Sequence, residues 1–291
     1  MSEIQRPRTS ESEAGPDSGG AQRSKTSPLS AVQSLLQSIL PVHVSSSLAP
    51  IQRSESLVHS REVGFAKRRQ EFHSGRVCAV HALRGAGWTS NLSESAAGSR
   101  TDVPESEDLQ AIVGVGPDRC PQWPTGFVGS ISHSQNWSWA VAASAQYLAG
   151  IGIDTEVIMT PEIHETVRSE VGTELEWALL SKQTLRPELE TTVLFSIKET
   201  FFKLWYPLVK QFYDFTDVHL VQVTAESHLA NVDLTTGHLS FGLHTRRAST
   251  EMSGRADQHT MTRVEAVWTD AEVFTVAWLA PKVATTSWER I

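Results

Sequence analysis

The sequence predicts an α+β fold whose strands pair mainly in antiparallel fashion. Three observations favour this class: segments with helical spacing of apolar residues, short strand-like segments separated by turns, and no regular strand–helix–strand alternation. With 291 residues, of which 40% are hydrophobic, the chain can build one large domain or two small lobes around a core. No stretch approaches the roughly 18 to 20 consecutive apolar residues that a membrane-spanning helix needs, so no span is expected.

The first 30 residues are expected to form a disordered tail. They are rich in Ser, Gly, Pro and charges of both signs, and such a segment has too little apolar surface to offset its ordering entropy. They lack the apolar centre of a secretory signal, and their acidic residues argue against an organellar transit peptide, so a cytoplasmic protein is expected. Folded structure is expected to begin near Ala31, where apolar residues at helical spacing predict a helix that stops at Pro41.

The remaining elements follow from the same periodicities. A second helix is predicted over residues 62–83, and the Gly-, Ser- and Asp-rich stretch 85–116 is expected to be mostly loop. Two later helices are predicted over residues 162–181 and 191–206, the second of which ends at Pro207. Strands are expected at residues 127–132, 137–144, 147–157, 218–225, 232–245, 264–270 and 272–280.

The charge balance and the cysteine count exclude further classes of protein. Twenty-five Lys and Arg residues against 33 Asp and Glu residues give a net charge of −8. An acidic chain is a poor match for nucleic acid or an anionic membrane surface, although this argument does not extend to a local basic patch. Cys78 and Cys120 are too few for a disulfide framework or a closed zinc site, which suits a reducing compartment.

Asp154 and Glu156 lie at the end of the apolar strand segment at residues 147–157. Side chains two positions apart on a strand point to the same face, so the two carboxylates are expected to project together. Adjacent carboxylates resist simultaneous ionisation unless a cation lies between them, and hard oxygen ligands suit Mg²⁺. The alternative is a strand end that runs into a solvated acidic turn, and the spacing alone leaves both interpretations open.

Glu199 and Lys203 are four residues apart in a predicted helix, and therefore share one face. An ordinary surface ion pair is the simple interpretation. Large apolar residues nearly surround the pair, however, which favours a buried helix whose charges must be paired or bound to a ligand. These apolar neighbours are Phe195, Phe201, Phe202, Leu204, Trp205 and Tyr206.

Two further segments could bind an anion. Ser132 and His133 follow a small-residue strand, but adjacent strand residues face opposite sides and no Gly-x-Ser-x-Gly motif occurs, so a Ser/His hydrolase is disfavoured. Arg68 and Arg76 are eight residues apart, about two helical turns, and could hold one extended polyanion at two points. A solvated basic helix face is the alternative for this arginine pair.

Taken together, these segments resemble the 4′-phosphopantetheinyl transferase superfamily, in the branch of the enterobactin synthase component D enzymes. The resemblance rests on four motifs in the order that is typical of the family, and it extends over roughly residues 33–280. The motifs are KRRQEFHSGR (67–76), WPTGFVGSISH (123–133), GIDTE (152–156) and FSIKETFFK (195–203).

The resemblance implies an activity and a role for each motif residue. Members of this family transfer the phosphopantetheine arm of coenzyme A to a serine of a carrier protein and release adenosine 3′,5′-bisphosphate. By resemblance, Asp154, Glu156 and Glu199 hold Mg²⁺, Glu199 is the general base, and Lys203 contacts the pyrophosphate while Lys198 adds positive potential. Arg68 and Arg76 bind the nucleotide end of coenzyme A, with Ser132 and His133 at its 3′-phosphate.

The resemblance also implies two similar lobes in a pseudo-twofold arrangement, with coenzyme A and Mg²⁺ between them. The expected division is a tail at 1–30, an N-terminal lobe at 31–146 and a C-terminal lobe at 147–291. A monomer of this doubled length is expected to act on apo acyl or peptidyl carrier proteins of fatty-acid, polyketide, siderophore or nonribosomal-peptide synthesis. The alternatives are a Mg²⁺-dependent coenzyme A pyrophosphatase and a non-catalytic scaffold that binds carrier proteins.

Two positions depart from the family pattern. The family often has an arginine two residues after the cysteine of its first motif, where this chain has Val80 after Cys78. Before the WP pair the family tends to place a basic residue that reaches the nucleotide, and Arg119 is the local candidate. Neither departure affects the expected metal or transfer residues.

Overall fold

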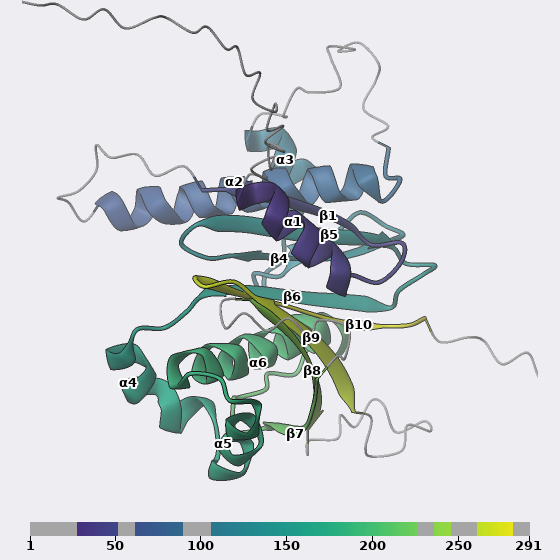
Figure 1. Ribbon diagram of the computed structural model, residues 1–291. Helices are drawn as coiled ribbons and strands as arrows, with labels where there is room; N and C mark the ends of the chain where they lie inside the picture. The colour runs from purple at the N-terminus through teal and green to yellow at the C-terminus, as the bar shows by residue number, and fades with distance from the viewer. Residues whose placement is uncertain (1–27, 52–61, 90–105, 226–235, 246–260, 282–291) are drawn as a thin grey trace, which may run out of the picture.

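The computed structural model describes residues 28–51, 62–89, 106–225, 236–245 and 261–281 (Figure 1). The helices are α1 (Pro28–Ile39), α2 (Glu62–Gly85), α3 (Ser106–Ile112), α4 (Pro161–Val171), α5 (Glu174–Leu180) and α6 (Pro187–Val209), with a 3₁₀ turn at Ser181–Gln183. The strands are β1 (Ser45–Pro50), β2 (Gly114–Val115), β3 (Pro121–Gln122), β4 (Phe127–His133), β5 (Trp137–Ser144), β6 (Gly150–Val157), β7 (Val218–Ala225), β8 (Gly237–Thr245), β9 (Thr262–Trp268) and β10 (Glu272–Leu279). Within these ranges no helix has the length and apolarity that crossing a membrane requires.

The first half of the chain is a three-stranded antiparallel sheet in the order β1-β5-β4, with α2 lying across one face (Figure 1). Small residues allow the close approach of helix and sheet. Ala79 and Ala82 of α2 pack against Ala140 and Ala142 of β5, and all four side chains are fully buried. The β2–β3 hairpin and α3 lie beside this layer.

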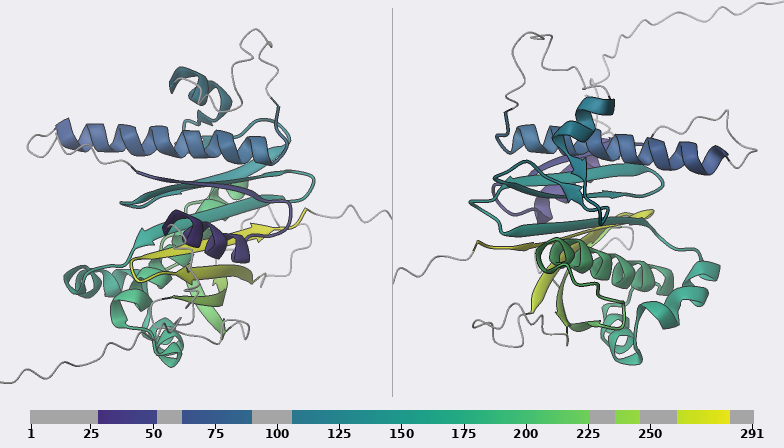
Figure 2. Two further views of the ribbon diagram at one scale, coloured as in Figure 1. Left: turned by 45° about the horizontal axis from the view of Figure 1, so that its top comes forward. Right: turned by 180° about the vertical axis from the view of Figure 1, so that it is seen from behind.

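The second half is a five-stranded antiparallel sheet in the order β6-β10-β9-β8-β7, and α6 packs along it (Figure 2). The packing is apolar: Val193, Ile197 and Phe201 of α6 lie in one buried cluster with Phe241 and Val264 of the sheet. Because α6 is apolar around much of its circumference, its few charged side chains lie beside a core.

The two halves meet where the edge strand β4 of the first sheet lies beside the edge strand β6 of the second (Figure 1). Helix α1 closes the other side of this junction, because Leu36 and Ile39 share a buried cluster with Trp139 of β5 and Phe274 of β10. One core therefore extends across both halves, and side chains of β4 can reach groups on β6 and α6.

The predicted α+β class with antiparallel pairing is confirmed, and each half repeats the plan of one long helix on an antiparallel sheet. Most of the predicted tail, residues 1–27, lies outside the described residues, whereas α1 begins at Pro28, before the expected start near Ala31. The lobe boundary between residues 146 and 147 falls in the turn that joins β5 to β6 and stays a prediction.

Several element predictions were wrong in detail. Helix α6 runs through Pro207 to Val209, because the left-handed Lys210 donates its N–H to the Tyr206 carbonyl and completes the last turn. The helix predicted over residues 162–181 is broken, since Gly172 adopts an extended conformation and a capping box at Thr173 starts α5. Strand β1 and helix α3 were not predicted.

Gly152 allows β6 and α6 to lie in backbone contact, and its replacement by alanine is expected to destabilise the fold. A Cβ there would come within 2.7 Å of the Leu204 nitrogen and closer still to the Thr200 carbonyl oxygen. Overpacking of this kind costs about 1–3 kcal/mol of unfolding free energy, measurable by urea denaturation. Gly64→Ala is the matched control, because that exposed helical position has nothing within 4 Å and is expected to be neutral or stabilising. Equal stability of the two variants would contradict the prediction.

Candidate functional site at the junction of the two halves

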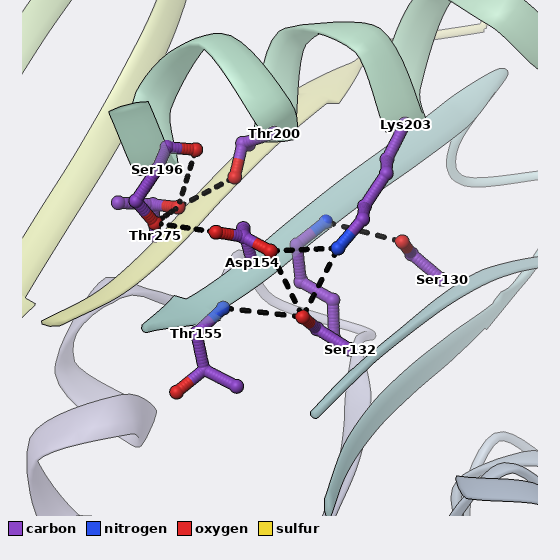
Figure 3. A network of polar contacts seen from close by, with 9 residues as sticks. Ser130, Ser132, Asp154, Thr155, Ser196, Thr200, Lys203 and Thr275 are labelled. Atoms are coloured by element: carbon purple, nitrogen blue, oxygen red, sulfur yellow. Dashed lines mark hydrogen bonds and ion pairs between the residues drawn. The ribbon is translucent and has the colours of Figure 1, made fainter. Parts of the chain in front are cut away.

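Asp154 lies at the centre of a buried polar network on β6 (Figure 3). Its Oδ1 accepts a hydrogen bond from Ser132 Oγ at 2.9 Å and forms an ion pair with Lys203 Nζ at 2.6 Å. Its Oδ2 accepts from Ser196 Oγ at 2.8 Å. With only 2% of the residue exposed, these three partners satisfy both carboxylate oxygens and fix the orientation of the side chain.

A chain of hydroxyl groups continues the network behind Asp154 (Figure 3). Thr275 lies directly opposite Asp154 in the β6–β10 ladder, and its Oγ1 is 2.9 Å from Ser196 Oγ and 2.5 Å from Thr200 Oγ1. All three hydroxyl residues are fully buried. Hydroxyl groups of β10 and α6 therefore support the carboxylate at Oδ2, whereas Lys203 contacts Oδ1.

Lys203 links Asp154 to solvent-accessible space. Its side chain is 27% exposed and lines the large cavity described below, while Nζ also donates to Ser132 Oγ at 3.0 Å. Burial alone would lower the pKa of this ammonium group, but Asp154, and at longer range Glu199 and Glu156, hold it above its usual value. Lys203 is therefore a fixed positive charge in the cavity wall.

Glu156 and Glu199 add two further carboxylates near this charge. Burial, reinforced by the neighbouring Asp154 carboxylate, raises the pKa of Glu156 to about 8. Burial also raises the pKa of Glu199, against the opposing effect of Lys203. In contrast to Asp154, neither side chain has a hydrogen bond or ion pair to another described residue. Lys203 therefore does not offset the effect of burial, which favours the protonated form of both carboxyl groups.

The donor set of Asp154, Glu156 and Glu199 fits a hard cation such as Mg²⁺ in its chemistry. All three side chains supply carboxylate oxygens, and burial, followed by the neighbouring Asp154 carboxylate, raises the pKa of Glu156, a shift that a bound cation would oppose. Their side chains are not gathered, however: in the ranges that the structure describes, no three His, Cys, Asp or Glu residues form a metal-binding group. The metal ligands named from the sequence thus stay a prediction.

A cavity of about 860 Å³ opens on the other side of Lys203, between α2, β4 and the end of α6. Its basic wall is formed by Arg68, Arg76, Arg119, His133 and Lys203, with Glu71 and Asp118 as acidic neighbours. Arg76 is 6% exposed, donates through one guanidinium nitrogen to the Gly114 carbonyl at 3.2 Å, and stacks over Phe72. Its Nε has no hydrogen-bond partner among the described residues, which leaves a buried donor beside the cavity.

Aromatic residues at the end of α6 form the other wall. Phe202 stacks on Tyr206 and meets Phe212 edge to face, at centroid distances of 5.0 and 5.4 Å. Phe202 and Phe212 also line a second, small cavity of about 100 Å³, and Glu199 lies on that side. Phe202 and Phe212 therefore line both cavities, whereas Glu199 lines only the small one.

Comparison with known families matches both halves of the chain. Residues 59–143 match the 4′-phosphopantetheinyl transferase N-terminal domain, and residues 150–259 match the 4′-phosphopantetheinyl transferase superfamily. The chain belongs to the 4′-phosphopantetheinyl transferase superfamily. The predicted Arg68, Arg76, Ser132 and His133 fall in the first matched range, and the three carboxylates and Lys203 fall in the second.

Curated members of the superfamily are similar to this chain over part of their length. The 4′-phosphopantetheinyl transferase Svp of Streptomyces mobaraensis is 33% identical over 53% of this chain and 54% of its own length. Enterobactin synthase component D of Salmonella typhi is 31% identical over 47% and 48%, respectively. The chain spans about half the length of these two relatives. The 4′-phosphopantetheinyl transferase PptT of Mycobacterium tuberculosis is 28% identical over 65% of this chain and 78% of its own.

Two residues that the superfamily resemblance assigned to coenzyme A have other contacts. The Lys198 ammonium group donates to Glu176 Oε1 at 2.8 Å and to the Val171 and Phe215 carbonyls at 2.9 Å each. A lysine has three N–H donors, so none is left for a phosphate, and we do not carry Lys198 forward as a cofactor contact. Ser132 is 4% exposed and faces Asp154, whereas its neighbour His133 lines the cavity.

Sequence reasoning did not identify Ser196, Thr200 or Thr275 as parts of the site. Ser196 precedes the Lys198-Glu199 pair within a quoted motif, so its position was a usable signal. Thr275 lies in an apolar strand far along the chain, and only the β6–β10 register places it opposite Asp154. The cavity wall also includes Trp123 and Phe202, which lie within two of the quoted motifs, and Tyr206 and Phe212, which give no sequence signal beyond general apolarity.

Proposed function

We propose that the protein transfers the 4′-phosphopantetheine group of coenzyme A to a serine of an apo acyl or peptidyl carrier protein, releasing adenosine 3′,5′-bisphosphate. The observation that carries this proposal is the Asp154–Lys203 ion pair in the wall of a large basic cavity. The volume of about 860 Å³ suits a small-molecule ligand, and a basic wall suits a ligand with several phosphates. Membership of the superfamily supports the same reaction.

In this proposal the nucleotide end of coenzyme A lies against α2. The Arg68 side chain is exposed at the cavity wall, while Arg76 is held in place by Phe72 and the Gly114 carbonyl. Guanidinium groups match phosphate oxygens through paired N–H donors. His133, which the strand geometry turns toward the cavity, is the proposed contact of the 3′-phosphate, and Arg119 is near enough to the same wall to add charge.

The transfer step needs a base, a positive charge that neutralises the phosphate oxygens, and a leaving group. Glu199 accepts the proton of the carrier serine hydroxyl, directly or through a water. The serine oxygen attacks the β-phosphorus of coenzyme A, forming a new phosphodiester bond, and the bond to the oxygen of adenosine 3′,5′-bisphosphate breaks. Lys203 neutralises charge that accumulates on the phosphate oxygens and on the leaving group, and Asp154 holds Lys203 in place.

Mg²⁺ is the proposed metal, held by Asp154, Glu156 and Glu199 against the pyrophosphate. Bound there, Mg²⁺ would supply Lewis-acid stabilisation of the phosphate charge. Glu156 and Glu199 support this proposal, because burial raises the pKa of both carboxyl groups despite the opposing effect of Lys203.

The partners and the location are also proposals. A superfamily relative carries the name enterobactin synthase component D, which supports carriers of siderophore synthesis as one candidate class. Free thiols at Cys78 and Cys120 support a reducing, cytoplasmic location. The core shared by the two halves supports a protein that works as a monomer.

The proposal is tested by incubating the protein with coenzyme A, Mg²⁺ and an apo carrier protein, and then weighing the carrier. A mass gain of one phosphopantetheine group is the expected result. Cleavage of coenzyme A without a carrier would replace the transferase with a pyrophosphatase. Carrier binding with no consumption of coenzyme A would indicate a non-catalytic scaffold.

Arg68→Gln is expected to weaken coenzyme A binding about tenfold, the loss of one charge-assisted hydrogen bond to phosphate. The binding should also become less sensitive to salt, which isothermal titration at two ionic strengths measures. Arg69→Gln is the matched control, because the neighbouring Arg69 is exposed on α2 but does not line the cavity. If both variants bind coenzyme A like the wild type, Arg68 does not contact the nucleotide.

A further inference from the structure

The seam between the two halves is made by serine side chains. Strands β4 and β6 lie side by side but belong to different sheets, so no backbone ladder joins them. Instead, Ser130 Oγ accepts a hydrogen bond from the Ile153 N–H and Ser132 Oγ accepts one from the Thr155 N–H, each at 3.2 Å (Figure 3). Ile153 and Thr155 are fully buried, so these amides would otherwise lack a partner.

Ser132 differs from Ser130 in making two further contacts. Its hydroxyl donates to Asp154 Oδ1 at 2.9 Å and accepts from Lys203 Nζ at 3.0 Å. A serine hydroxyl has one donor and two acceptor positions, so the three contacts with Asp154, Thr155 and Lys203 use its full capacity. Ser132 thus holds both members of the ion pair from the opposite half of the molecule.

We propose that Ser132 is a positioning residue that acts through Asp154 and Lys203, and that it does not bind the 3′-phosphate of coenzyme A. It faces the seam and is 4% exposed, whereas His133, one residue later, faces the cavity. The proposal rests on the proposed transferase function, because it assigns Ser132 to the reacting end of the substrate and leaves the nucleotide end to its neighbour.

The test compares coenzyme A with dephospho-coenzyme A, which lacks the 3′-phosphate. Ser132→Ala is expected to lower kcat about tenfold, the loss of one hydrogen bond to a charged group, by the same factor with both substrates. The dissociation constant for coenzyme A, measured without transfer by isothermal titration, is expected to stay unchanged. His133→Ala is expected to do the opposite: it weakens coenzyme A binding about tenfold and leaves dephospho-coenzyme A binding unchanged.

Two further variants separate positioning from general stability. Ser130→Ala removes the seam bond to Ile153 without touching Asp154 or Lys203. Because Ser130 also lines the cavity, the two variants are compared at saturating coenzyme A, where Ser130→Ala should lower Tm like Ser132→Ala but reduce kcat much less. Ser132→Thr keeps the hydroxyl group with its donor and two acceptor positions, so it should restore kcat. If Ser132→Ala does not fold, Ser132→Cys, which keeps the volume and only a weak donor, takes its place in the same comparison.

Two results would overturn the inference. The first is a loss of coenzyme A affinity in Ser132→Ala that disappears with dephospho-coenzyme A, because that pattern shows contact with the 3′-phosphate. The second is an equal fall of kcat in Ser132→Ala and Ser130→Ala, which shows a purely structural role. Failure of the proposed function looks different, since the wild-type protein itself would then bind no coenzyme A or modify no carrier.

Discussion

Glu199→Gln is expected to lower the rate of phosphopantetheine transfer by about 10²- to 10⁴-fold, the usual contribution of a general base. The substitution keeps the size of the side chain but removes its capacity to accept a proton. Glu199 is half-buried on α6, one helical turn before Lys203, and lines the small cavity behind Phe202 and Phe212. Because it does not line the basic cavity, coenzyme A binding is expected to persist. Single-turnover transfer and isothermal titration measure the two effects separately.

A matched control keeps this experiment specific. Glu165→Gln makes the same chemical change on the exposed face of α4, outside both cavities, and is expected to leave transfer intact. Transfer by Glu199→Gln at the wild-type rate would show that another group takes the proton. Loss of coenzyme A binding in the same variant would place Glu199 at the nucleotide instead.

Much of the site could be predicted from the sequence because its chemistry is local. Asp154 and Glu156 follow from strand alternation, and Glu199 and Lys203 follow from helical spacing within an apolar helix. These patterns place side chains on a common face without any knowledge of the fold. What the patterns could not show is the contact between the two segments, because Asp154 meets Lys203 only through the packing of α6 on β6.

The fold was less predictable where a strand or helix depends on its neighbours. Strand β1 has the sequence SSSLAP, which has little strand character alone but pairs along its whole length with β5. Helix α6 continues through Pro207 because its C-terminal cap is completed three residues later. Pairing and capping of this kind are tertiary or end effects that override local propensity.

Tertiary contacts also explain why Ser132 and Lys198, which the resemblance placed at coenzyme A, have other partners. A motif records which residue types occur, and it cannot distinguish a serine that touches a ligand from one that holds the residue that does. Lys198 lines the small cavity together with its neighbour Glu199, yet its ammonium group forms an ion pair with Glu176 and does not reach the large cavity. The positions of the Ser132 and Lys198 side chains follow from their burial and from their hydrogen-bond and ion-pair partners.

Lys203→Met is expected to lower transfer by about 10²- to 10³-fold, the usual cost of removing one donor that stabilises developing negative charge. Methionine keeps the length and the apolar packing of the side chain, so the loss reports on the ammonium group alone. Lys203→Arg keeps the charge and should retain more activity. Lys182→Met, at an exposed position outside the cavities, is the control for the loss of a lysine.

Lys203→Met is also expected to change the thermal stability of the protein without substrate. Without Lys203, Asp154 keeps no ion-pair partner within the described part of the chain, and its repulsion with Glu156 and Glu199 is no longer opposed by the ammonium group. Lys203→Met should therefore unfold at a lower temperature than the wild type, and added Mg²⁺ should raise Tm more in this variant than in the wild type. Thermal denaturation with and without Mg²⁺ measures this difference. An equal response to Mg²⁺ in both proteins would mean that the ion does not bind at these carboxylates, and the proposed metal site would then be wrong.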